Sequence, residues 1–175
     1  MSYLRQSIYF LAGLFLAIFE VGVVRTLPGI LGLLSVASIA LTIFFFLRQK
    51  ETTFALAAGL GVGLGFFSGY GFLVWILIVI FAAVIGYFLS NSILTDQSLF
   101  ALVILNAGIH FSLFLIELIA SNLFGRSSLI RLSFNTSLAL GGAEALVAET
   151  LLLYLFFLIY RKSRGNKIAR LVHVR

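Results

Sequence analysis

Three polar side chains interrupt an otherwise apolar stretch in the second half of the chain: Asn106, His110 and Glu117. Their spacings of four and seven residues would place all three on one face of an α-helix, within roughly 40° of one another. Such a face can bind a polar ligand or an ion, or it can hydrogen-bond to neighbouring helices in a membrane. The sequence leaves both interpretations of this polar stripe open.

Three glutamates lie in the other apolar segments. Glu144 and Glu149 are five residues apart, which separates them by about 140° on a helix, so they do not form a matched acid and base. Glu149 lies deeper in its segment and joins the candidate binding residues, and a pair between Glu149 and His110 is one arrangement that the sequence permits. Glu20, near the end of the first apolar segment, is expected to offset Arg25.

Known patterns for catalysis and metal binding are absent from the sequence. There is no His-Glu-x-x-His motif, no cysteine, and a single aspartate, Asp96, so neither a zinc-hydrolase motif nor an aspartyl dyad can form. The two histidines, His110 and His173, are too few for a multi-histidine metal site. We therefore expect no enzymatic activity, no metal and no cofactor.

The composition identifies the solvent in which these residues must lie. Hydrophobic residues make up 62% of the chain and charged residues only 10%, with a mean hydropathy of +1.17; soluble domains typically carry about 25% charged residues. A chain of 175 residues has far more apolar surface here than one core can bury. The excess is expected to face lipid, which predicts an all-α, polytopic membrane protein.

Charged residues, Pro28 and turn residues divide the chain into apolar segments, each to be compared with the roughly 20 residues that a bilayer-spanning helix needs. The predicted spans are six, at about 7–24, 29–47, 53–68, 72–90, 98–120 and 139–160. They form a single domain over 1–160, in which 121–137 mixes apolar residues with Arg126 and Arg131 and is expected to lie flat in the membrane interface. Residues 161–175 form a basic tail.

Basic residues predict the orientation of the spans, because Lys and Arg favour the cytoplasmic side. With six spans, nine basic residues share the side of the two termini, and three lie on the other side. Both termini are therefore predicted to be cytoplasmic. The tail contains no acid and follows an apolar segment directly, so it is expected to bind anionic lipid headgroups, at about 1 kcal/mol per basic residue, and not nucleic acid.

The third segment is rich in glycine. Gly61, Gly65 and Gly69 recur at intervals of four, a stripe of small residues that allows another helix to approach closely. No Gly-Lys-Ser or Gly-Lys-Thr follows, so the stripe is not a phosphate-binding loop. We interpret it as a helix-packing surface.

Three stretches of the sequence form a recognisable order. Pro28 opens the second segment, which closes on a basic turn with Arg48 and Lys50, and the last segment runs directly into Tyr160-Arg161-Lys162. Between them, residues 61–71 read Gly-Val-Gly-Leu-Gly-Phe-Phe-Ser-Gly-Tyr-Gly. These stretches resemble the MreD family of bacterial rod-shape proteins, whose motif is Gly-x-x-x-Asp-x-x-Ser-Gly followed shortly by Gly. Gly65 stands where the family usually has its aspartate.

The resemblance implies a non-catalytic scaffold of the wall-elongation machinery in the bacterial cytoplasmic membrane. Such a protein would bind MreC-like and other elongation proteins through its helix faces. The family is also similar in architecture to the six-helix substrate-binding subunits of energy-coupling-factor transporters. The alternative function is thus a small-molecule transport subunit, with a pocket lined by Asn106, His110, Glu117 and Glu149; a membrane enzyme is the least favoured class.

Overall fold

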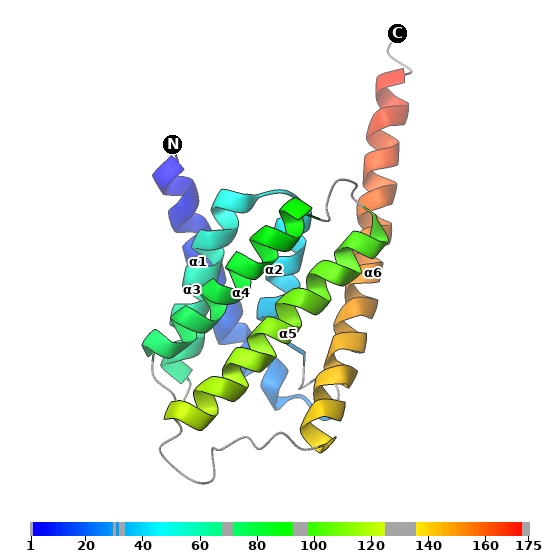
Figure 1. Cartoon of the computed structure of the whole chain (residues 1–175). Helices are drawn as coiled ribbons and strands as arrows, with labels where there is room; N and C mark the ends of the chain where they lie inside the picture. The colour runs from blue at the N-terminus through cyan, green and yellow to red at the C-terminus, as the bar shows by residue number, and fades with distance from the viewer. Residues whose placement is uncertain are drawn as a thin grey trace.

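The computed structural model describes residues 2–29, 31, 34–67, 72–92, 98–124 and 136–172, and among these it has helices and no strand. The elements in chain order are α1 (Ser2–Gly22), the short 3-10 helix η1 (Val24–Thr26), α2 (Val36–Phe46), α3 (Lys50–Phe67), α4 (Phe72–Ser92), α5 (Leu99–Phe124) and α6 (Thr136–Val172). Successive helices run in alternating directions, and the start of α1 and the end of α6 lie at the same end of the bundle (Figure 1).

Four helical stretches are long and apolar enough to cross a membrane: Tyr3–Thr26, Phe72–Ser92, Leu99–Ile116 and Leu140–Ser163. The predicted class, a helical multi-pass membrane protein, agrees with this finding. The other two helices fall short for different reasons. α2 has 11 residues, about 16 Å of helix, and α3 begins with Lys50-Glu51 and carries four glycines.

The second segment differs most from the sequence prediction, which placed one helix over 29–47. Gly29 has a φ of +66°, a conformation outside the right-handed helix, and Ser35 is still extended, so α2 begins only at Val36. Ser35 is the N-cap, and its hydroxyl accepts a hydrogen bond from Ser38 N. The α-helix of this segment therefore begins at Val36 and not at residue 29.

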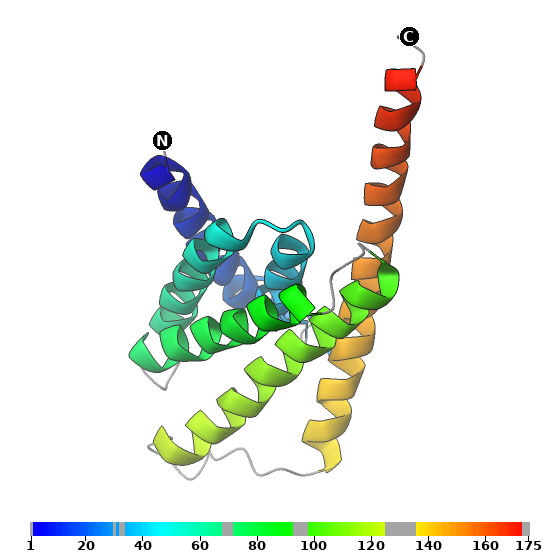
Figure 2. The same cartoon turned by 45° about the horizontal axis from the view of Figure 1, so that its top comes forward.

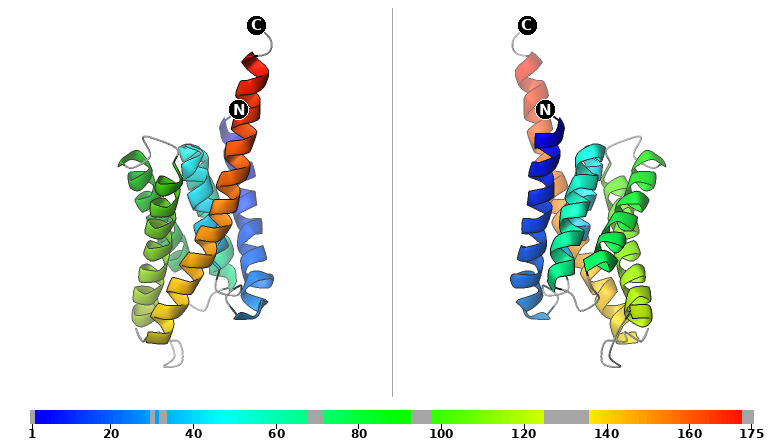
Figure 3. Two further views of the ribbon diagram at one scale, coloured as in Figure 1. Left: turned by 90° about the vertical axis from the view of Figure 1, so that its right-hand side faces the viewer. Right: turned by 90° about the vertical axis from the view of Figure 1, so that its left-hand side faces the viewer.

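The structure also corrects the end of the chain. α5 continues to Phe124 and α6 begins at Thr136, so helices take up both ends of the segment expected to lie flat; residues 125–135 are outside the described part of the chain. α6 then continues through most of the expected tail to Val172. Its 37 residues make a helix of about 55 Å, which is longer than the roughly 30 Å core of a bilayer and extends past the other helices (Figure 3).

Short as it is, α2 lies at the centre of the bundle and contacts each of the other five α-helices. Seven of its residues are buried, and Phe45 and Phe46 are fully enclosed. The ring of Phe46 lies 5.7 Å from that of Tyr160 on α6, while Leu102 and Ile109 of α5 belong to the same buried apolar cluster. The core is thus built around a helix that could not span a membrane alone.

Glycines let α3 lie between two helices at once. Gly61 and Gly65 face α4, where an added Cβ would come within 2.7 Å of the Cα atoms of Ile76 and Phe72 respectively. Gly59 and Gly63 face α1, and a Cβ on Gly59 would overlap the carbonyl oxygen of Phe10. The close approach of α1, α3 and α4 is visible in Figure 3. Gly69, predicted to extend the stripe, lies outside the described residues.

Gly59→Ala is expected to lower the melting temperature in detergent, because the added methyl group meets backbone that cannot move aside locally. Overpacking of this kind costs about 1–3 kcal/mol. Gly22→Ala is the matched control, since a Cβ there meets nothing within 4 Å and alanine favours a helix over glycine by up to about 1 kcal/mol. Equal melting temperatures of the two variants would contradict the packing role of Gly59.

Candidate functional site

The N-terminal end of α2 gathers the buried carboxylates of two other helices. Glu149 of α6 accepts a hydrogen bond from Ser35 N at 2.9 Å, and Glu20 of α1 accepts one from Ala37 N at 3.0 Å. Both side chains are buried, with exposed fractions of 0% and 3%. The first N–H groups of a helix lack partners within it, and its N-terminus carries partial positive charge. The two carboxylates supply both the acceptors and the opposite charge.

His110 joins this arrangement from α5. Its Nδ1 lies 3.1 Å and 3.0 Å from the two carboxylate oxygens of Glu149, with exposed side-chain fractions of 12% and 0%. The pair that the sequence permitted is therefore present. Because a carboxylate and a bare imidazole nitrogen are both acceptors, one proton must lie between them, carried by either group. The pair connects α5 and α6 beside the start of α2.

Asn106, one turn earlier on α5, binds the side of α2. Its Oδ1 accepts hydrogen bonds from Ser38 Oγ and Thr42 Oγ1, each at 3.2 Å. The residue is fully buried, and its Nδ2 has no hydrogen-bond partner among the described residues. An unsatisfied buried donor costs about 1–3 kcal/mol, so this amide nitrogen lowers the stability that the polar cluster provides.

Glu20 belongs to this site although the sequence did not predict it as a binding residue. Besides accepting from Ala37 N, it lies 3.4 Å from Arg25 Nη2, so the expected offset between these charges is present. Arg25 in turn lies over the ring of Trp75, 5.9 Å from its centroid. The sequence signal for a wider role was a carboxylate inside an apolar segment, but its second partner depends on where α2 begins.

The remaining predicted residues fall elsewhere. Glu144 is exposed on α6, away from the buried Glu149, as their angular separation on the helix requires. Glu117 lies on α5, but its side chain is outside the described part of the structure. In that described part, no group of three or more His, Asp or Glu side chains is placed to hold a metal ion.

The geometry therefore defines a polar tie, which we name the α2 cap: Glu20, Ser35, Asn106, His110 and Glu149. Its members come from α1, from the N-cap of α2, from α5 and from α6, and they hydrogen-bond mainly to α2 and to one another. Comparison with family models, with curated proteins and with solved structures gave no match. The features that bear on function are therefore the α2 cap, the helix surfaces and the sequence motifs.

Glu149→Leu is expected to destabilise the protein by about 2–5 kcal/mol, since it leaves Ser35 N–H and His110 without their shared partner in an apolar interior. Glu149→Gln should cost less, because its Oε1 can still accept from Ser35 N and its amide can donate to Nδ1. Melting temperatures in detergent measure both effects. Glu144→Leu, on the exposed face of the same helix, is the control, and a loss as large as that of Glu149→Leu would refute the capping role.

Proposed function

We propose that this protein is a non-catalytic membrane scaffold of the bacterial cell-shape and wall-elongation machinery, of the MreD type, which binds partner membrane proteins through its helix faces. The observation that carries the proposal is that the buried polar side chains pair with groups of the bundle itself. His110, Glu149 and the oxygen of Asn106 make hydrogen bonds within the bundle. Groups engaged in this way hold helices together, so binding is left to the outer surface.

The surface best suited to a partner is that of α6. Among the described helices it contacts α5 and α2, and it stands at the edge of the bundle (Figure 2). Within Leu140–Ser163 of α6, only 17% of the most apolar stretch is buried. Exposed large apolar residues follow much of its length: Leu140, Val147, Leu151, Leu152, Tyr154, Leu155, Leu158 and Ile159. In a membrane such a face can pack against the helix of a partner as well as against lipid, because both are apolar.

The proposed topology has six spans in the cytoplasmic membrane, with both termini in the cytoplasm. In it the segment that contains α2 makes the second crossing and α3 the third. A helix too short to span the membrane alone is tolerated where protein surrounds it, and α2 contacts each of the other five α-helices. Arg5 and the basic turn at Arg48 and Lys50 line one pocket, which places these cations together at one end.

Site-specific photo-crosslinking in native membranes tests the scaffold. A crosslinker at Leu155 of α6, which is 55% exposed, is expected to capture an MreC-like or another wall-elongation protein. The same crosslinker at Phe81 of α4, which is 53% exposed, is the matched control and should capture much less of it. Recovery of transporter ATPase subunits from Leu155, with no elongation protein, would overturn the proposal.

A transport subunit that binds a small molecule is the second candidate, and one observation favours it. In the first turn of α2, Ser38 hydrogen-bonds to Asn106, whose Nδ2 has no partner among the described residues. Helix ends that lie within the membrane commonly form the binding sites of transporters. Native mass spectrometry should then show a bound small molecule that His110→Ala removes. A ligand-free spectrum for both forms would count against this candidate.

A further inference from the structure

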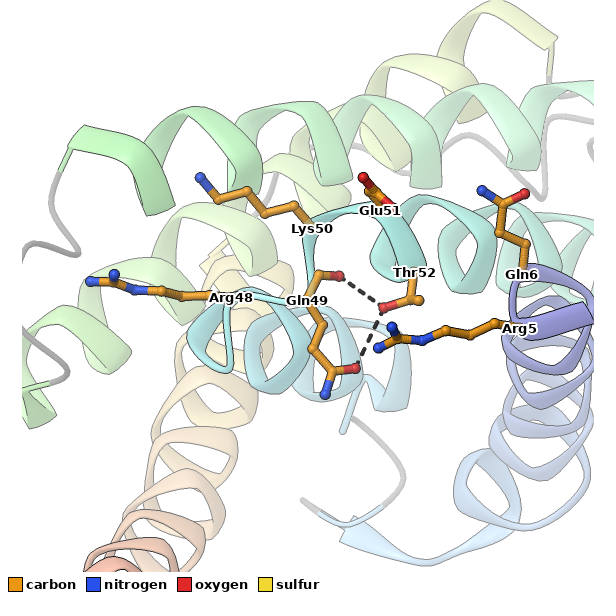
Figure 4. Close-up of a pocket in the computed structure, with 7 residues that line it drawn as sticks. All are labelled: Arg5, Gln6, Arg48, Gln49, Lys50, Glu51 and Thr52. Carbon is orange, nitrogen blue, oxygen red and sulfur yellow. Dashed lines mark hydrogen bonds between the residues drawn. The ribbon is translucent and has the colours of Figure 1, made fainter. Parts of the chain in front are cut away.

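A basic pocket lies between the start of α1 and the turn that joins α2 to α3 (Figure 4). It has a volume of about 550 Å³ and is lined by Arg5, Gln6, Arg48, Gln49, Lys50, Glu51 and Thr52. Three cations and one carboxylate give this lining a formal charge of +2. The pocket follows the C-terminal end of α2, whereas the α2 cap lies at its N-terminal end. The proposed scaffold function assigns no ligand to this pocket.

The turn holds a cation in a position that normally belongs to glycine. Arg48 N donates to Phe45 O and Gln49 N donates to Phe44 O, at 2.9 and 3.1 Å, which is the hydrogen-bond pattern of a Schellman helix end. The residue at its centre, Arg48, accordingly has a φ of +59°. A side chain in this left-handed conformation costs about 1–2 kcal/mol relative to glycine. The chain therefore places an arginine at the pocket despite a local cost in stability.

Arg5 is the cation of this pocket that extends toward the turn. It lies over the ring of Tyr9, 5.8 Å from its centroid, and extends toward Gln49 and Thr52 (Figure 4). Gln49 Oε1 accepts a hydrogen bond from Tyr9 Oη at 3.3 Å, and the Thr52 hydroxyl donates to the backbone oxygen of Gln49 at 2.9 Å. A guanidinium suits the oxygens of a phosphate because it can donate two parallel hydrogen bonds.

The other cations lie around this point. Lys50 donates to Asn91 Oδ1 and lies 5.2 Å from the ring centroid of Tyr87 on α4, so it contributes positive potential more than direct contact. Arg48 and Lys50 both extend away from Arg5 in Figure 4. Glu51, on the opposite edge, provides the only negative charge of the lining.

We propose that this pocket binds the phosphate of an anionic phospholipid, with Arg5 as the direct donor. The lipid source follows from the outer face of α1, where Leu4, Ile8, Leu11 and Phe15 are exposed by 71%, 57%, 62% and 68%. Their spacing of four, three and four residues forms one apolar stripe along the helix, about 90° around the helix axis from Arg5. An acyl chain can lie on this stripe while the long side chain of Arg5 reaches its phosphate, whereas a free phosphate would leave the stripe unused.

Native mass spectrometry of the full chain in detergent tests the site. Phosphatidylglycerol should be retained at several-fold lower concentration than phosphatidylcholine, whose headgroup carries no net charge. Arg5→Gln combined with Lys50→Gln should abolish that preference. Arg126→Gln combined with Arg131→Gln removes the same charge from residues that belong neither to the pocket lining nor to the basic tail, and should preserve it. Equal retention of the two lipids by the unchanged protein, or an equal loss in both double variants, would overturn the proposal.

Arg48→Gly separates binding from folding. Glycine relieves the left-handed conformation, so the melting temperature should stay the same or rise while retention of phosphatidylglycerol falls. Unchanged retention in this variant would contradict attraction of the lipid by the cations of the pocket and would overturn the proposal. Inorganic phosphate, added at the concentrations used for the lipid, should not displace it, and displacement would assign the pocket to a soluble anion and overturn the lipid assignment.

Discussion

A helix that begins inside an apolar bundle needs acceptors for its first N–H groups, and this need organises the molecule. Leaving such groups unpaired away from water is costly, and so is burying a carboxylate within a membrane. At the start of α2 each requirement is met by the other. Glu149 lies 114 residues from Ser35, and Glu20 lies 17 residues from Ala37. One local requirement therefore brings the first and last helices of the bundle to the same point.

The buried polar side chains of the α2 cap make hydrogen bonds to one another and to α2. His110 and Asn106 extend the cap to α5, so three helices are connected to a fourth that is itself too short to cross a bilayer. A bundle fixed at its centre presents stable outer faces. The outer faces are apolar along α1 and α6, and a basic pocket lies at one end; the proposed contacts with lipids and other membrane proteins rest on these surfaces.

Composition and hydropathy were sufficient to predict a helical membrane protein, because both report directly on the solvent that surrounds the side chains. The polar stripe placed Asn106 and His110 on one face, and both residues do bind within the bundle. The start of α2 could not be predicted in this way. Residues 29–47 are almost uniformly apolar. The start of the α-helix at Val36 depends on the backbone at Gly29 and on acceptors that come from distant helices.

The capping role of Glu20 was missed for the same reason, since Arg25 alone accounted for its charge in the sequence. The glycines of α3 were understood only in part. A four-residue period identified one packing face, but glycines two residues apart alternate between two partners, and only the positions of α1 and α4 reveal that Gly59 and Gly63 serve a second helix. A pattern with one period describes one neighbour, and the glycines of α3 pack against two, α1 and α4.

The same glycines affect how the protein enters the membrane during synthesis. Glycine adds little to the apolar character of α3, and the Lys50-Glu51 pair at its start reduces it further, so α3 is a weak insertion signal for the translocation machinery. α2 is weak for a different reason, its length. In the proposed six-span topology, α2 and α3 therefore enter the bilayer together with the strongly apolar α1 and α4 on either side. The features that enclose the two central helices in the finished bundle make their insertion depend on their neighbours.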